Sequence, residues 1–237
     1  MLSDIHLTNS GGIISTGIEI DDSVRAVIQF IKKYFTPFAE NNKRQVALNE
    51  KGLNQRLCIF LNQNINAEPF FFQSEFMENV ESGISPQVDI GTLRKENNIG
   101  AFERQYNDDS FFSMEAKRLP TTGSNREQEY VTGFDSQCGA IERFKKGIHG
   151  SRLKYAAIIG YIQEESFNHW FLKINSWIEN LANGEGKDLW NHEDKIEKVT
   201  AGNSSYQELK SLNGRIINGQ PAEKINIFHF WVNLIPS

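Results

Sequence analysis

The stretch that decides the fold is FFSMEAKRL, residues 111–119. Its aromatic first half predicts a strand that begins in a hydrophobic core. Side chains along a strand alternate between two faces, so Glu115 and Lys117 share one face of this strand. Buried charge is costly unless it is paired or holds a metal. We therefore expect the strand to begin in the core and to end at a functional site.

A second carboxylate lies upstream in a similar setting. Asp89 belongs to the strand-like run PQVDI, residues 86–90. An Asp in one strand followed by Glu-x-Lys in the next resembles the PD-(D/E)xK nuclease superfamily, which has the restriction-endonuclease-like fold. The family's Pro-Asp pair is not intact, because Pro86 lies three residues before Asp89. The resemblance implies that Asp89 and Glu115 bind a divalent metal and that Lys117 helps to place the attacking water.

The resemblance also implies a fold and a cofactor. The fold would be α/β (α+β), with a mixed central sheet flanked by helices. We expect a single domain over residues 1–237, with its core at about 46–163 and variable decoration at 1–45 and 164–237. Hard oxygen ligands suit Mg²⁺ (or Mn²⁺), and Glu50 and the backbone carbonyl of Ala116 are additional candidate ligands. For Glu50 the alternative is a first-turn acid favoured by the helix dipole.

Composition restricts the class of protein. The chain of 237 residues has 39% hydrophobic residues, among them 17 Phe, so it can bury a sizeable core. No apolar run approaches the roughly 20 residues of a membrane span, and the N-terminus lacks the pattern of a signal peptide. We therefore expect a cytoplasmic protein with no membrane partner. Cys58 and Cys138 do not form a disulfide framework, and we expect both to be reduced core thiols.

The distribution of charge suggests a nucleic-acid partner. The net charge is −5, yet residues 117–154 hold eight Lys or Arg against four acids. A basic segment directly after the candidate site fits a groove for phosphates, with DNA as the expected partner. The candidate contacts are Arg118, Arg143, Lys145 and Lys146. The alternative is an ordinary solvated helix face, in which the two lysines complement the helix dipole.

The remaining pattern predicts the elements around the site. Apolar spacing predicts helices at 22–36, ending at Thr36-Pro37, at 48–62 and at 167–181, and a helical region from Arg126 to about Gly147. We expect Ile141, Phe144 and Ile148 to face inward there, and Lys145 to face outward or flank. Strands are expected at 69–80, 87–93 and 110–119 as an antiparallel meander, at 155–162 as a central strand, and at 207–217 and 224–234.

These observations leave three functional hypotheses. The first is a Mg²⁺-dependent endonuclease, a phosphodiester hydrolase of restriction or phage defence by analogy, with a homodimer left open. The second is a catalytically inactive nuclease-fold module that binds nucleic acid or assembles with partners. In the third the charges are coincidental in another enzyme or small-molecule binder. For the Glu-x-Lys motif itself, the alternative is a same-face ion pair of Glu115 with Lys117 at a strand end, worth about 0 to 1 kcal/mol if exposed.

Overall fold

The computed structural model describes residues 21–43, 49–78, 86–95, 109–121, 123–133, 138–184, 186–199 and 203–236. Residues 1–20 and 96–108 are among those that lie outside these ranges. The helical elements are α1 (Asp22–Asn42), α2 (Glu50–Gln63), η2 (Ser124–Tyr130), α3 (Ala140–Lys145), α4 (Phe167–Asn183) and η3 (His192–Asp194). The strands are β1 (Phe70–Met77), β2 (Gln87–Arg94), β3 (Phe112–Leu119), β4 (Tyr155–Ile162), β5 (Glu197–Lys198), β6 (Tyr206–Ile217) and β7 (Gln220–Asn233).

All seven strands form one mixed sheet in the order β1-β2-β3-β4-β7-β6-β5. The first three strands are antiparallel neighbours, which confirms the predicted meander and the adjacency of the strands at 87–93 and 110–119. β4 then pairs in parallel with both β3 and β7. The predicted α/β (α+β) class with a mixed sheet is therefore confirmed, and the strand expected at the centre does lie there.

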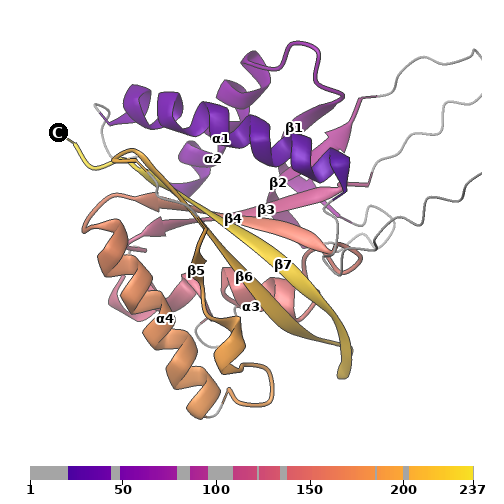
Figure 1. Cartoon of the computed structure of the whole chain (residues 1–237), viewed down its shortest axis with the longest axis vertical. Coiled ribbons are helices and arrows are strands. Elements are labelled where there is room, and N and C mark those ends of the chain that lie inside the picture. Colours follow the sequence, from indigo (N-terminus) through magenta and orange to yellow (C-terminus); the bar gives the residue numbers. More distant parts are fainter. Residues whose placement is uncertain are drawn as a thin grey trace, which may run out of the picture.

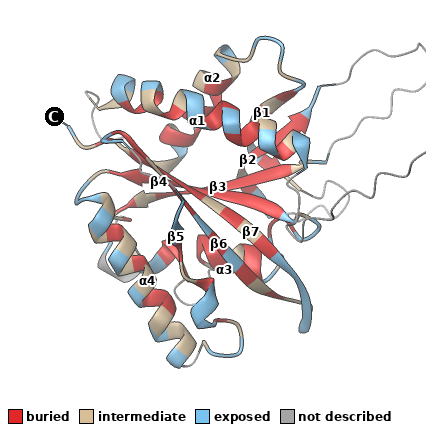
Figure 2. Ribbon diagram, viewed as in Figure 1, coloured by how far each residue is buried: buried red, intermediate tan, exposed pale blue. Residues whose placement is uncertain are grey.

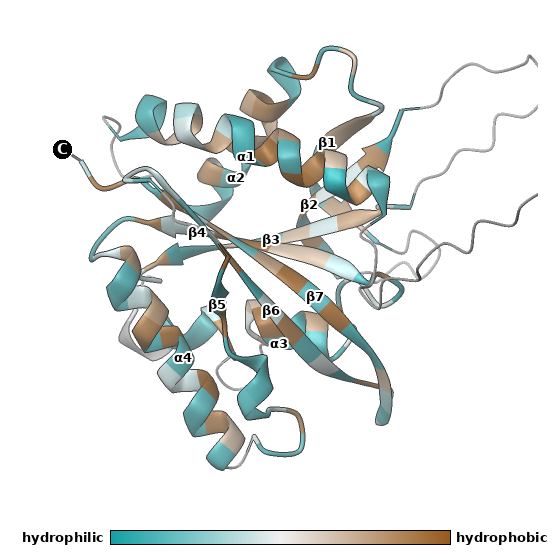
Figure 3. Ribbon diagram, viewed as in Figure 1, coloured by the Kyte–Doolittle hydropathy of each residue, from teal (hydrophilic) through white to brown (hydrophobic). Residues whose placement is uncertain are grey.

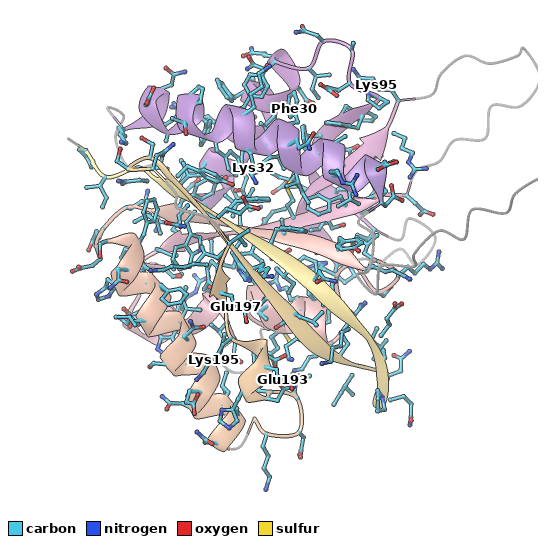
Figure 4. All side chains as sticks on the ribbon, viewed as in Figure 1. Phe30, Lys32, Lys95, Glu193, Lys195 and Glu197 are labelled. Atoms are coloured by element: carbon cyan, nitrogen blue, oxygen red, sulfur yellow. The ribbon has the colours of Figure 1, made fainter. Side chains whose placement is uncertain are left out.

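Helices cover both faces of this sheet (Figure 1). α1 and α2 pack over one face in a core that includes Phe30, Phe35, Met114 and Ile159. The ring of Phe30, labelled in Figure 4, lies 5.6 Å from that of Phe70 on the edge strand β1. η2, α3 and α4 cover the other face in a second core. β3 and β4 are buried almost throughout between these layers (Figure 2).

α1 begins where the sequence predicts and ends later. Asp21 caps the helix by accepting a hydrogen bond from the Ser23 N–H. The predicted end at Thr36-Pro37 is wrong, because Pro37 lies inside a helix that continues to Asn42. A proline removes one backbone hydrogen bond, but Phe38 and the next residue continue the buried stripe. The side of α1 turned away from the sheet is hydrophilic (Figure 3).

The helical region expected from Arg126 to Gly147 is not one helix in the described residues. It consists of η2 and the six-residue α3, which begins after Gly139. Ile141, Phe144 and Lys145 are buried at the i, i+3 and i+4 positions of α3. Ile148 follows Gly147, whose φ of 65° reverses the backbone, and is 37% exposed. The predicted orientations of Lys145 and Ile148 are therefore wrong.

Two expectations from composition have mixed outcomes. Both cysteines are free, but only Cys58 is buried, whereas Cys138 is partly exposed. Within the described ranges, none of the helices has the length and apolarity that a bilayer crossing requires.

The burial of Lys145 has a measurable consequence for stability. Its Nζ lies 2.7 Å from Asp194 Oδ2, and both side chains are 0% exposed. Removing one partner of a buried ion pair leaves an uncompensated charge. We expect Lys145→Ala to lower the free energy of unfolding by about 3–5 kcal/mol in urea denaturation. Lys146→Ala is the control, because that side chain is 43% exposed and its loss should cost less than about 1 kcal/mol. Equal effects of the two variants would contradict the buried pair.

Candidate active site

The candidate site lies where β2 separates from β3. The register of these strands runs from Thr92↔Phe112 to Ile90↔Met114, one residue short of Asp89. Beyond that point, Asp89 Oδ2 accepts a hydrogen bond of 2.8 Å from the Ala116 N–H. A side-chain carboxylate thus satisfies an N–H that a paired strand would otherwise bind. This arrangement fixes Asp89 next to the middle of the Glu-x-Lys segment.

Helix α2 contributes a second carboxylate to the same place. Glu50 is the first residue of α2, which Asn49 caps by accepting a hydrogen bond from the Gly52 N–H. Glu50 Oε1 lies 2.9 Å from Lys117 Nζ, and Glu50 Oε2 accepts a hydrogen bond of 3.3 Å from the Arg118 N–H. The structure therefore brings Glu50, Lys117 and β3 together, as the sequence predicts.

Glu115 lies deepest in the cluster. Its side chain is 0% exposed, whereas that of Glu50 is 29% exposed. Glu115 Oε2 accepts a hydrogen bond of 3.1 Å from Arg143 Nη1. Glu115 Oε1 lies 3.3 Å from His149 Nε2, yet it has no hydrogen-bond partner among the described residues. The exposed ion pair of Glu115 with Lys117, which was the alternative at the sequence level, is therefore not what the structure contains.

The electrostatics of these groups reflect crowded negative charge. Burial, followed by repulsion from Glu115, raises the pKa of Asp89 to about 7. Burial also raises the pKa of Glu115, and Arg143 and Lys117 offset this only in part. Burial alone would lower the pKa of Lys117, but Glu50, Asp89 and Glu115 outweigh it and raise that pKa. The ammonium therefore remains charged among carboxylates that resist sharing the site without a cation.

This donor set fits a hard divalent cation in its chemistry. Asp89, Glu115 and Glu50 supply carboxylate oxygens, the ligands that Mg²⁺ prefers, and the orphaned Glu115 Oε1 is a buried polar atom that lacks a partner. As they stand, no three His, Cys, Asp or Glu side chains in the described ranges are grouped so that they could hold a metal. Each carboxylate is instead engaged by a neighbour, so a cation would have to displace contacts such as the pair of Glu50 with Lys117.

Two residues that sequence reasoning missed belong to this cluster. His149 is 1% exposed, and its Nδ1 lies 3.5 Å from Glu78 Oε2. Glu78 in turn accepts hydrogen bonds from the Ser113 hydroxyl at 2.6 Å and from the Gly150 N–H. Two features of the sequence could have pointed to these residues. Glu78 directly follows the strand β1, and His149 lies between two nearby glycines.

The predicted phosphate contacts have different surroundings in the structure. Lys145 is buried against Asp194 and cannot reach a phosphate at the surface, which corrects that assignment. Arg143, with a side chain 30% exposed, holds Glu115. Lys146 is exposed and lies 2.7 Å from Glu142, and Arg118 is half-buried. For Arg118, Arg143 and Lys146, phosphate contact stays a prediction.

Comparison of the chain with protein-family models, with curated proteins and with solved structures finds no match. The residues of this site and their geometry are therefore what indicates a function.

The raised pKa of Asp89 predicts how stability without metal depends on pH. A carboxyl whose pKa is higher in the folded state binds its proton more tightly there, so its contribution to stability is present below pH about 4 and is lost as the pH rises through 7. Asp89→Asn can still accept the hydrogen bond from Ala116 but does not titrate. In EDTA, wild type should lose stability between pH 5 and pH 8, whereas the variant should not lose this contribution. The free energy of unfolding of Asp89→Asn minus that of wild type should therefore increase by on the order of 2 kcal/mol over this range. Urea denaturation of both proteins at the two pH values measures this, and a difference that does not change with pH would contradict it.

Proposed function

We propose that this protein is a metal-dependent nuclease of the PD-(D/E)xK type that hydrolyses phosphodiester bonds in DNA. The observation that carries the proposal is the convergence of Asp89, Glu115, Lys117 and Glu50 at the point where β2 leaves β3. Sequence spacing alone could not guarantee this, because these residues come from three elements that are distant in the chain. The biological setting that we propose, by analogy, is cytoplasmic restriction or phage defence.

The architecture supports the proposal. A helix precedes three antiparallel strands, and a parallel strand follows after a helical connection, over α2, β1, β2, β3 and β4. This is the order that the restriction-endonuclease-like core requires. The remaining strands, β5 to β7, would then be additions that extend the sheet beyond β4.

The proposed chemistry divides between the cation and the chain. Bound Mg²⁺ or Mn²⁺ would neutralise the phosphate and supply an attacking water. Asp89, Glu115 and Glu50, with the Ala116 carbonyl, would hold it. Lys117 points its ammonium among these carboxylates, where it can orient a water and stabilise negative charge that develops on the phosphate. Arg143 donates a hydrogen bond to Glu115, so the buried carboxylate has a partner besides the cation that it would hold.

Two exposed cations close to the site are better placed for substrate than Lys145. Lys51 is 83% exposed, and its pKa is raised by Glu75 and more weakly by Asp89. Arg126 is 53% exposed, and Glu129, with a weaker contribution from Glu50, raises its pKa. Lys51 interacts electrostatically with Asp89, and Arg126 with Glu50. Both cations could therefore attract a phosphate that binds at the site.

One observation favours a second candidate, an inactive nuclease-fold module that binds nucleic acid. Glu50 and Glu115 are each already paired with a cation, Lys117 and Arg143. A cluster neutralised in this way has less need of a metal ion. Metal binding by the wild-type protein separates the two candidates.

Substitutions in the site test the chemistry. Asp89→Asn and Glu115→Gln should each abolish Mg²⁺-dependent cleavage of plasmid or linear DNA, because each removes a charged ligand. Lys117→Ala should lose about 10²- to 10⁴-fold in rate yet still bind Mn²⁺ in calorimetry, because it removes no ligand. Glu223→Gln, which changes an acid 66% exposed and paired with Lys154, is the control and should cleave normally. If wild type binds no Mg²⁺ or Mn²⁺ and cuts no nucleic acid tested, the inactive module becomes the better account.

Salt dependence tests the proposed phosphate contacts. Each phosphate contact removed should reduce the slope of log affinity against log salt concentration by about one. We expect this for Lys51→Ala and for Arg126→Ala, measured by fluorescence anisotropy with labelled DNA in EDTA. Lys224→Ala is the control matched to Lys51, since both lysines are exposed and paired with an exposed glutamate. A slope that is unchanged in the first two variants would exclude them as contacts.

A further inference from the structure

A second layer of polar groups lies behind Glu115. His149 stands between two carboxylates, with Nε2 3.3 Å from Glu115 Oε1 and Nδ1 3.5 Å from Glu78 Oε2. Glu78 is anchored by the Ser113 hydroxyl and by the Gly150 N–H. Burial would raise the pKa of Glu78, but His149, Ser113 and Gly150 outweigh it and lower that pKa. Glu78 therefore stays ionised beside the imidazole.

The loop that carries His149 is held by a side chain of β6. Gly147 and Gly150 have φ values of 65° and 58°, which few other residues adopt without strain, so they bend the backbone on both sides of the histidine. Arg215 on β6 donates hydrogen bonds to the carbonyls of Gly150, Ser151 and Leu153. A buried arginine side chain therefore holds the backbone directly after the histidine.

The depth of these groups restricts what they can do. His149 is 1% exposed and Glu115 is 0% exposed, so the imidazole cannot touch a substrate. It can act only through Glu115. Glu115 Oε2 is held by Arg143, and His149 is the group that faces the other oxygen, Oε1. Arg143 thus holds one oxygen of this carboxylate by a hydrogen bond, and the imidazole lies in close contact with the other oxygen, which has no hydrogen-bond partner among the described residues.

We propose that Glu78 and His149 are positioning residues that hold the Glu115 carboxylate in the orientation required to bind a divalent cation. This inference rests on the proposed function. Ligand carboxylates are commonly held by outer partners, whose loss weakens metal binding about 10- to 100-fold. Here the outer partner is a histidine–glutamate pair on a loop clamped by Arg215. A purely structural role, in which His149 only fills space under the loop, would leave metal affinity unchanged.

The test is calorimetric titration of Mn²⁺ and Mg²⁺ into the full chain. His149→Gln and Glu78→Gln should each weaken binding by about 10- to 100-fold, and cleavage should recover when the Mg²⁺ concentration is raised by the same factor. The KM for DNA at saturating Mg²⁺ should not change, because neither residue meets the substrate. His169→Gln, a histidine 39% exposed on α4 and near Glu165, is the control and should bind like wild type.

The outcomes separate this inference from the proposed function. If wild type binds the ion and both variants bind it equally well, even with a lowered melting temperature, the positioning role is wrong and the nuclease proposal stands. If wild type binds neither ion, both are overturned. Should His149→Gln fail to fold, Glu78→Gln and Ser113→Ala decide, because they leave the ring in place and loosen only its support. Wild-type affinity in both would reject the inference.

Discussion

The burial of the Glu115 carboxylate is the constraint on which the site depends. A carboxylate with no exposed surface in the middle of a sheet is costly unless charged or hydrogen-bonding groups surround it. Arg143, His149 and Lys117 supply these groups from a short helix, from the loop after it and from the same strand. Two cationic side chains and one imidazole thus surround a single carboxylate. Replacing any of them changes the electrostatic conditions of the others.

The separation of β2 from β3 explains why these groups can meet. Residues on neighbouring strands normally satisfy one another's backbone, which leaves no room for a helix residue. Once the pairing ends at Ile90↔Met114, the Ala116 N–H is taken by Asp89 and the Arg118 N–H by Glu50. Helix α2 packs on one face of the sheet, yet Glu50 reaches Lys117, whose side chain leaves β3 on the other side. The end of the pairing between β2 and β3 therefore frees the backbone N–H groups of β3 to which the carboxylates of the site bind.

Local pattern predicted most of the elements, and the resemblance to the nuclease superfamily named the acids of the candidate site. Alternation along residues 111–119 placed Glu115 and Lys117 on one face. Pro37 led to a wrong prediction of the end of α1, because buried residues beyond it continue the helix. His149, Glu78 and the partner of Lys145 could not be predicted, because each depends on a contact between residues far apart in the chain. Periodicity describes which face a residue occupies, but not which distant side chain meets it there.

The position of β7 has a consequence for how the chain folds. β4 lies at the centre of the finished sheet, but its second neighbour, β7 (residues 220–233), comes after every other described strand in the chain. Until β7 pairs, one side of β4 presents an open strand edge whose side chains are apolar on both faces, the kind of edge that joins other chains. Parallel pairing between distant segments also forms slowly. A chain in which β7 has not yet paired therefore leaves its central strand open to aggregation, and the pairing of β7 with β4 ends that exposure.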